Sequence, residues 1–256
     1  MELTRDGLMG GRVVIDQPRG GYRAGSDAIL LAAAVPARPE QKVLDAGAGV
    51  GAVSLCLAAR AARVQVRGVE LQGDLVDLAA GNIAANKLAD RVVILQGDIR
   101  QPPAEIGREV FAHTVCNPPF YAAGSTSASP DPGKAMAHGE GDTDLRDWIA
   151  FCLRRTVPGG TVTFIHRAER LDAILSGLRQ GGGDLVVFPL WPKPGRPAKR
   201  VIVQAKVGGK GPTVLHPGLC LHHEDGRDTD EARAILRGGE PLDLIRAFST
   251  FVESPC

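Results

Sequence analysis

Apolar and polar positions along this chain follow two different periods, and the places where the period changes mark its elements. Residues 12–16 alternate with a period of two after a double-glycine turn, which predicts the second strand of an N-terminal hairpin. A short apolar run then follows Ser26 and Asp27, and either side chain could cap a helix there. We expect this hairpin and helix to precede the main domain.

From residue 41 onward, strand-like and helix-like segments alternate. Strands are expected at residues 42–45, 64–70, 91–95, 110–116, 161–166, 184–190 and 200–206, and helices at residues 52–63, 73–86, 145–156 and 168–180. This alternation predicts βαβ units and therefore an α/β fold with a parallel sheet. Residues 122–141 are rich in Gly, Ser and Pro and are expected to form a long loop, either functional or disordered.

The C-terminal part carries weaker signals. Residues 213–222 could form a hairpin around a Pro-Gly turn, and Thr229 could cap a short helix that ends at Arg237. The predicted division of the chain is an N-terminal hairpin and helix lid at 1–36, a main domain at 37–207 and a C-terminal extension at 208–256 that packs on the same domain.

Composition narrows the class of protein. The 256 residues are 44% hydrophobic, as in an ordinary globular fold, and the formal charge is only +1, so any polyanion site must be a local patch. Five scattered cysteines without C-x-x-C spacing predict reduced thiols and no metal site. The apolar runs are much shorter than a membrane span and no signal segment opens the chain, so we expect a cytosolic protein with no membrane partner.

A glycine loop follows the first strand of the main domain. Asp45 precedes Gly47, Gly49 and Gly51, and glycine lets the backbone approach a ligand without a Cβ clash. A dinucleotide fingerprint has one more residue before its third glycine and holds a pyrophosphate, which Asp45 would repel. The loop therefore favours a cationic ligand, such as the sulfonium and ammonium groups of S-adenosylmethionine.

Two further acids end the next two strands. Glu70 ends the second strand, where a carboxylate can accept hydrogen bonds from both ribose hydroxyls. We expect the next residue, Leu71, to border the cofactor as well. Asp98 follows the third strand, where it could accept a hydrogen bond from an adenine amino group, with Ile99 beside the ring. Asp98 could instead simply cap a turn.

A candidate catalytic loop ends the fourth strand, with the sequence Asn117-Pro118-Pro119-Phe120-Tyr121. The lone pair of an aromatic or amide-like amine is delocalised, so a site that methylates it must accept hydrogen bonds from its N–H groups. The Asn117 side chain and the Pro118 carbonyl could supply two acceptors, held rigid by the two prolines. Phe120 and Tyr121 could stack on a base.

These motifs resemble the class I amino-methyltransferases that carry an Asn-Pro-Pro-aromatic signature. Residues 17–31 resemble the corresponding segment of the bacterial tRNA(Val) adenine-N6 methyltransferase family, and the resemblance covers about residues 3–207. It implies a Rossmann-like fold with a mostly parallel seven-stranded sheet, helices on both faces and an N-terminal hairpin and helix extension. It also implies S-adenosylmethionine as cofactor, tRNA as partner, and Tyr22, Arg23 and Asp27 near the cofactor.

A basic stretch could contact RNA. No acid occurs between Asp184 and Glu224, and clustered Lys and Arg side chains supply phosphate affinity. The basic residues of this stretch are Lys193, Arg196, Lys199, Arg200, Lys206 and Lys210. The first four are the predicted RNA contacts, although a solvated hairpin would show the same composition.

Several alternative functions stay open at this point. Glutamine-N5 protein methyltransferases and guanine-N2 RNA methyltransferases share the Asn-Pro-Pro-Phe loop, so the loop indicates the reaction better than the substrate. A nicotinamide-dependent oxidoreductase would need the longer glycine spacing, and a non-enzymatic RNA-binding protein would not need the catalytic loop. The sequence does not distinguish a monomer from a homodimer.

Overall fold

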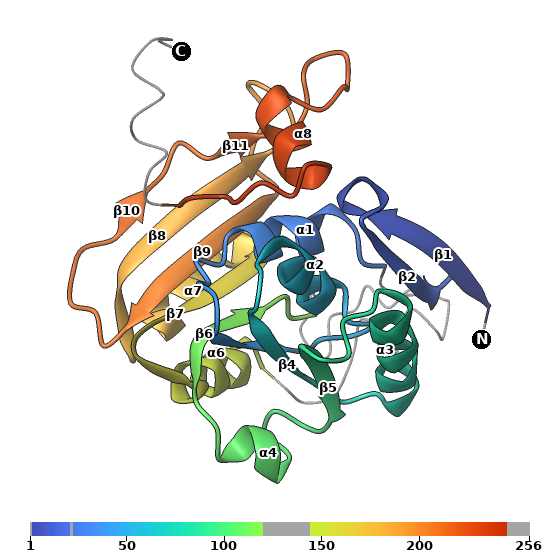
Figure 1. Ribbon diagram of the computed structural model, residues 1–256. Coiled ribbons are helices and arrows are strands. Elements are labelled where there is room, and N and C mark those ends of the chain that lie inside the picture. Colours follow the sequence, from blue (N-terminus) through green and yellow to red (C-terminus); the bar gives the residue numbers. More distant parts are fainter. Residues whose placement is uncertain (1, 21–22, 120–143, 245–256) are drawn as a thin grey trace.

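The computed structural model describes residues 2–20, 23–119 and 144–244 and shows one large mixed sheet covered by helices. The strand order is β10-β8-β9-β7-β6-β3-β4-β5, and β11 also pairs with β8 (Figure 1). The bounds of the seven long strands are β3 Lys42–Ala46, β4 Gln65–Glu70, β5 Val92–Gln96, β6 Phe111–Cys116, β7 Thr156–Arg167, β8 Gly182–Trp191 and β9 Arg200–Val207. Among these seven, only β9 runs antiparallel to its neighbours. The predicted mostly parallel α/β sheet is therefore confirmed.

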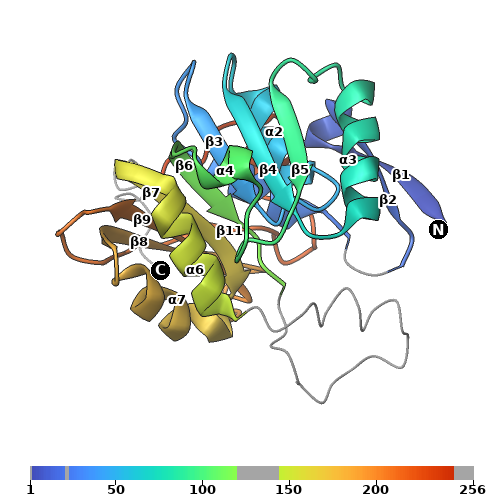
Figure 2. The ribbon, with the colours of Figure 1, turned by 90° about the horizontal axis from the view of Figure 1, so that it is seen from below.

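Alternate residues of the strands enter two separate hydrophobic cores. On β3, Val43 packs with one core and Leu44 with the other, as do Ile165 and Phe164 on β7. One core is covered by α1 Ser26–Ala33, α2 Ala52–Arg60 and α3 Gly73–Ala85, and the other by α4 Ala104–Gly107, α6 Leu145–Arg155 and α7 Leu171–Leu178. Figure 2 shows α6 and α7 together on their side of the sheet. Both faces are buried, as a parallel sheet requires.

Several predicted boundaries were wrong. The N-cap of α1 is Gly25, not Ser26 or Asp27, because both of these already lie in the first helical turn. The predicted helix at 168–180 is a 3-10 turn, η2 Ala168–Arg170, followed by the shorter α7. The short α4 has no apolar periodicity and was not predicted.

The C-terminal part differs most from expectation. The strands β10 Val214–Leu215 and β11 Leu219–Cys220 do not form a hairpin with each other; each pairs in parallel with β8. They make the sheet nine-stranded instead of seven-stranded. The edge strand β8 offers unpaired backbone groups, which a following segment can satisfy. The last described helix, α8 Asp230–Leu236, is capped by Thr229 as predicted, and it packs on α1.

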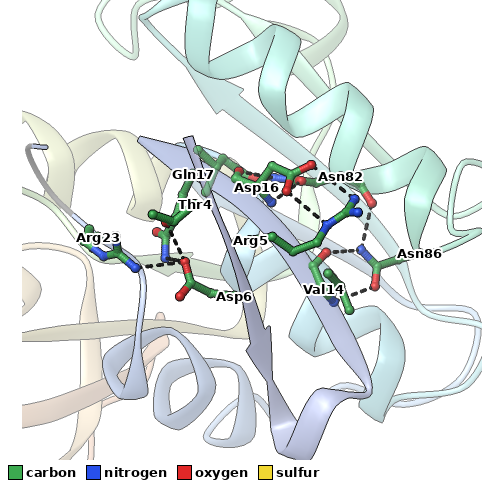
Figure 3. A network of polar contacts seen from close by, with 10 residues as sticks. Thr4, Arg5, Asp6, Val14, Asp16, Gln17, Arg23, Asn82 and Asn86 are labelled. Carbon is green, nitrogen blue, oxygen red and sulfur yellow. Dashed lines mark hydrogen bonds and ion pairs between the residues drawn. The ribbon is translucent and has the colours of Figure 1, made fainter. Parts of the chain in front are cut away.

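The predicted N-terminal hairpin is formed by β1 Leu3–Leu8 and β2 Val13–Pro18, joined by η1 Met9–Gly11. The free edge of β2 lies against α3 (Figure 3). Asn86 bonds both backbone groups of Val14, at 2.9 and 2.6 Å, and Asn82 bonds both backbone groups of Asp16, at 2.7 and 3.0 Å. Residues four apart on a helix rise about 6 Å and residues two apart on a strand about 6.8 Å, so the two side-chain amides match the strand.

Asn82 also reaches the glycine loop. Its Nδ2 donates to the Val50 carbonyl at 3.0 Å, and the side chain is buried. We predict that Asn82→Ala lowers the free energy of unfolding by about 2–4 kcal/mol, because several buried backbone groups lose their partners. Urea unfolding should show a smaller loss for the control Asn86→Ala, whose site is half-buried. Equal losses for the two variants would contradict a role for Asn82 in joining the hairpin to the loop.

Candidate cofactor and active site

The predicted motifs come together at one edge of the sheet. Parallel strands β5, β4, β3 and β6 are neighbours in that order, so their carboxyl ends lie side by side (Figure 2). Ala46 pairs with Cys116, and therefore Gly47 and Asn117 are the next residues of two adjacent strands. Ligands of open α/β sheets bind at such an edge. The site is thus assembled from residues that lie up to about 70 positions apart in the chain.

The glycine loop has the backbone conformation that its composition predicts. Gly47, Gly49 and Gly51 have φ values of 76°, 53° and 85°, all in the left-handed region that other residues rarely adopt. A Cβ on Gly47 would lie 3.0 Å from the ring of Trp148, and one on Gly51 would lie 3.0 Å from Ile94. Around Gly49 a Cβ would meet nothing within 4 Å. All three positions therefore favour glycine because of their backbone conformation. At Gly47 and Gly51 a side chain would also crowd a neighbouring residue.

Trp148 is a site neighbour that the sequence did not reveal. It lies in the first turns of α6, half-buried, with its six-membered ring against Gly47. Its position on the helix is one that any apolar core residue could occupy, so the sequence pattern alone does not indicate a role in the site. The structure places its ring at the carboxyl end of β3, beside the loop.

Glu70 holds the glycine loop directly. One carboxylate oxygen accepts from the Gly49 amide at 2.8 Å and the other from the Gln72 amide at 2.9 Å. Burial raises the pKa of Glu70, although these backbone hydrogen bonds oppose the shift. Each oxygen has a second lone pair, so the carboxylate can still accept from a ligand. The adjacent Leu71 is 48% exposed.

The Asp45 side chain is buried near the end of β3, just before the glycine loop. The Ser54 hydroxyl donates to its Oδ2 at 2.7 Å. Burial, with a smaller contribution from the charge of Glu70, raises the pKa of Asp45 to about 6, against the effect of the Ser54 bonds. A cation at this position would offset the cost of the buried charge. Ser54 was not singled out in the sequence, because it lies on an otherwise apolar helix.

Asp98 lies in a tight turn after β5. Its carboxylate accepts from the Arg100 amide at 2.8 Å and from the Arg100 guanidinium at 2.9 Å, and the Arg100 side chain lowers the pKa of Asp98. The alternative turn-capping role is therefore present in the structure, and a role toward adenine stays a prediction. Ile99 is buried in the core.

The catalytic loop is described only in part. Asn117 and Pro119 are half-buried and Pro118 is buried, directly after β6. Phe120, Tyr121 and Tyr22 lie outside the described residues, so their predicted roles have no structural description.

The two other residues of the predicted N-terminal lid have protein partners. Arg23 pairs with Asp6 at 2.8 Å, next to Gln17 and Thr4 (Figure 3). Asp27 pairs with Arg200 at 3.0 Å, which joins α1 to the start of β9. Arg200 is also one of the predicted RNA contacts; its guanidinium pairs with the Asp27 carboxylate, and a contact with RNA stays a prediction.

The remaining predicted RNA contacts lie between β8 and β9. Lys193 donates to the carbonyl of Glu224 at 2.9 Å, whereas Arg196 and Lys199 are exposed. Because β8 is parallel to the central strands and β9 is antiparallel, this connection lies at the same edge as the glycine loop.

Comparison with known proteins agrees with this geometry. Residues 23–130 match the family model described as a methyltransferase small domain. A tRNA1(Val) (adenine(37)-N6)-methyltransferase of Aeromonas hydrophila is 30% identical over 219 residues, which cover 84% of this chain and 89% of the relative. The chain belongs to this methyltransferase family. A relative of the same name from Tolumonas auensis is 29% identical and covers 87% of the chain and 85% of the relative.

Solved structures share the fold of the methyltransferase. One described as a predicted O-methyltransferase of Agrobacterium tumefaciens has a TM-score of 0.70 at 22% identity and covers 85% of this chain and 98% of that one. The M. jannaschii tRNA m1G37 methyltransferase has a TM-score of 0.55 at 14% identity and covers 82% and 57%. The chain is a class I enzyme whose methyl donor is S-adenosylmethionine, and this excludes the nicotinamide-dependent and non-enzymatic alternatives.

Within residues 2–20, 23–119 and 144–244, no group of three or more His, Cys, Asp and Glu side chains could hold a metal ion. In the same residues no helix is long and apolar enough to cross a membrane.

The buried Asp45 predicts a pH dependence. Its pKa in the folded state is about 6, above the ordinary 3.8, so folding favours the protonated form. The stability of the wild type relative to Asp45→Asn should therefore fall by about 2–3 kcal/mol as the pH rises from about 4 to above 6, and then stay constant. Urea unfolding of both proteins without cofactor over this range measures the difference. A difference that does not change with pH would contradict the raised pKa.

The contact between Gly47 and Trp148 predicts unequal effects of two matched substitutions. Gly49→Ala should cost about 1–2 kcal/mol, because it only strains a left-handed residue. Gly47→Ala should cost at least about 1 kcal/mol more, because the added methyl group must also displace the indole ring. Chemical denaturation of the two variants measures this, and equal costs would show that the ring does not restrict Gly47.

Proposed function

We propose that this enzyme methylates the exocyclic N6 amine of an adenine in tRNA. The observation that carries the proposal is the pairing of Ala46 with Cys116, because Gly47 and Asn117 then leave adjacent strands at the same edge. Neighbouring strands lie about 4.8 Å apart, so the cofactor loop and the catalytic loop border one small space. A methyl donor on one loop and an amine on the other are thereby held in the proximity that displacement needs.

The proposed catalytic group is the Asn117-Pro118-Pro119-Phe120 loop. The adenine amine is planar because its lone pair is delocalised into the ring. The Asn117 side-chain oxygen and the Pro118 carbonyl accept its two N–H groups and favour the pyramidal geometry of the transition state. The prolines limit the backbone freedom of these acceptors. Phe120 and Tyr121 are proposed to stack on the base.

The proposed cofactor residues follow the order of the strands. When bound, S-adenosylmethionine supplies a methyl group on a positively charged sulfur. Asp45 and the three glycines of the loop bind the charged methionine end, and Glu70 binds the ribose hydroxyls. Asp98 and Ile99 border the adenine ring. The fit rests on the buried Asp45 carboxylate, whose charge costs free energy without a cation, and on the remaining acceptor capacity of Glu70.

The N-terminal residues and the domain division are also proposals. Tyr22, Arg23, Asp27 and Leu71 complete the proposed cofactor site. The hairpin and helix at 1–36 act as its lid, the main domain is 37–207, and 208–256 is an extension of it.

The relatives point to tRNA as the substrate. Their name specifies adenine 37 of tRNA1(Val), and we propose the same nucleotide class for this chain. The cations at the edge near the catalytic loop support a polyanionic substrate over a glutamine side chain of a protein. A tRNA substrate would place the enzyme in the cytoplasm.

The test is methyl transfer from S-adenosylmethionine to purified substrates. Unmodified tRNA, guanine-containing RNA without the target adenine, and a protein with an accessible glutamine loop are offered in parallel, and the modified nucleosides are identified by mass spectrometry. N6-methyladenosine in tRNA alone supports the proposal. Methylglutamine or N2-methylguanosine as the product would replace it with the corresponding alternative.

The same assay tests the catalytic loop. Asn117→Ala should lower the turnover number by at least about 100-fold, because the missing acceptor matters most in the transition state. Cofactor affinity, measured by calorimetry, should change little and confirms that the variant is folded. Asn117→Asp keeps an acceptor oxygen and should retain more activity than Asn117→Ala. Near-normal turnover of Asn117→Ala would rule out the proposed role.

A further inference from the structure

The tertiary structure adds two arginines to the predicted basic stretch. The β7 strand ends at Arg167 and continues into η2, which ends at Arg170. Arg167 pairs with Arg200 in the antiparallel register of β7 and β9, and the Ala168 amide donates to the Lys199 carbonyl at 3.1 Å. Cations from two segments about 30 residues apart in sequence therefore meet at one edge of the sheet.

Three of these cations already serve the protein itself. Arg167 pairs with Glu169 at 2.9 Å, Arg200 pairs with Asp27, and Lys193 donates to a backbone carbonyl. The side chains of these three residues stabilise this edge of the sheet through bonds within the protein. A ligand would have to compete with these bonds to reach them.

The other three cations have a different environment. Arg196 and Lys199 are exposed and Arg170 is half-buried, and no carboxylate in the described part of the chain pairs with any of the three. We call Arg170, Arg196 and Lys199 the basic edge. Unpaired cations that gather at one place repel one another and favour an anionic ligand.

A buried histidine lies among the arginines of this edge. His166, the residue before Arg167, is buried, and its pKa is lowered to about 4 by burial and by the charges of Arg170, Arg200 and Arg167. The histidine therefore stays neutral at physiological pH and adds no charge of its own. The positive potential of this edge comes from the arginines and lysines.

The basic edge lies beside the catalytic loop. In the sheet, β7 is the direct neighbour of β6, and Phe164 of β7 pairs with Cys116. His166 and Arg167 thus lie just beyond the level of Asn117, one strand away. The cofactor residues lie on the opposite side of Asn117, at the ends of β3, β4 and β5.

From this placement we infer that the basic edge binds the phosphate backbone of the tRNA next to the target nucleotide. The inference rests on the proposed function and specifies how the RNA lies on the enzyme. The cofactor occupies the half of the edge formed by β3–β5, and the RNA backbone occupies the half formed by β7–β9. The base then reaches Asn117 between the two. Arg170 belongs to this surface although it lies outside the acid-free stretch of the sequence.

The same stretch provides a matched control. Lys206 and Lys210 were counted with the other cations in the sequence, but β9 runs away from the site. Lys206 is six positions after Arg200 on this strand, so it lies about 20 Å away, near the opposite edge of the sheet. Lys206 and Lys210 are both exposed, and Lys206 is paired in register with Thr161, six positions before Arg167 on β7.

The experiment compares two double variants that remove the same charge. Binding of unmodified tRNA to the full-length enzyme is measured at several salt concentrations for the wild type, Arg170→Ala/Lys199→Ala and Lys206→Ala/Lys210→Ala. Each lost phosphate contact lowers the slope of log affinity against log salt by about 0.7–0.9. We expect the first variant to lose about 1.4–1.8 of the slope and about 10-fold or more in affinity at low salt. The second variant should match the wild type, and Arg196→Ala should lose about one contact.

The outcomes separate this inference from the proposed function. Calorimetry with S-adenosylmethionine should give wild-type affinity for both double variants and shows that each is folded. If Arg170→Ala/Lys199→Ala does not fold, Arg170→Gln and Lys199→Gln are measured singly, and each should lose about one contact. An unchanged slope, or equal losses in the two double variants, overturns the inference while wild-type tRNA methylation still supports the proposed function. Failure of the wild type to bind or methylate tRNA overturns the proposed function itself.

Discussion

The parallel pairing of β3 with β4 on one side and with β6 on the other is the constraint on which the site depends. The carboxyl ends of parallel strands lie at the same edge of the sheet. The pairing of these three strands is therefore enough to bring Asp45, Glu70 and Asn117 close together. The loop after β3 must then turn sharply into α2, and its three glycines allow that turn. The carboxylate of Glu70 fixes the turn by accepting the Gly49 amide. A change in the register of β3 would displace Asp45 and the glycine loop relative to Glu70 and Asn117.

The site costs stability that the rest of the fold must supply. Two carboxylates, Asp45 and Glu70, are buried near each other, and the pKa of each is raised. Their burial is unfavourable without a cation, and the three glycines of the loop have no side chain that could pack. The two hydrophobic cores on either side of the sheet provide the compensating burial. Such tension between stability and function is expected where a charged cofactor must bind.

Segments outside the sheet are tied to the site through polar side chains. Asn82 joins the hairpin to the glycine loop, and Gln17 bonds both backbone groups of Ala24, at 2.8 and 3.3 Å, just before α1. Asp27 at the start of α1 pairs with Arg200 of β9. These bonds connect the proposed lid with both the cofactor half and the RNA half of the edge. The placement of residues 23–27 is thus fixed by the hairpin and the sheet together.

The sequence by itself determined the features that depend on near neighbours in the chain. The alternation of strands and helices, the glycine conformations at 47, 49 and 51, and the Thr229 cap each follow from local periodicity or local sterics. Their assembly at one edge also followed, because parallel strands have only one carboxyl edge.

Only the tertiary structure decided which distant groups pair. Arg200 was indistinguishable from Lys199 in sequence, yet Arg200 binds Asp27, 173 residues earlier, and Lys199 does not. The strands β10 and β11 pair with β8 instead of each other, because an open strand edge is available at β8. The direction of β9 separates Lys206 from the cations near Arg170. Such pairings form between segments that are far apart in the sequence and meet only in the folded protein. Local periodicity and composition therefore cannot predict them.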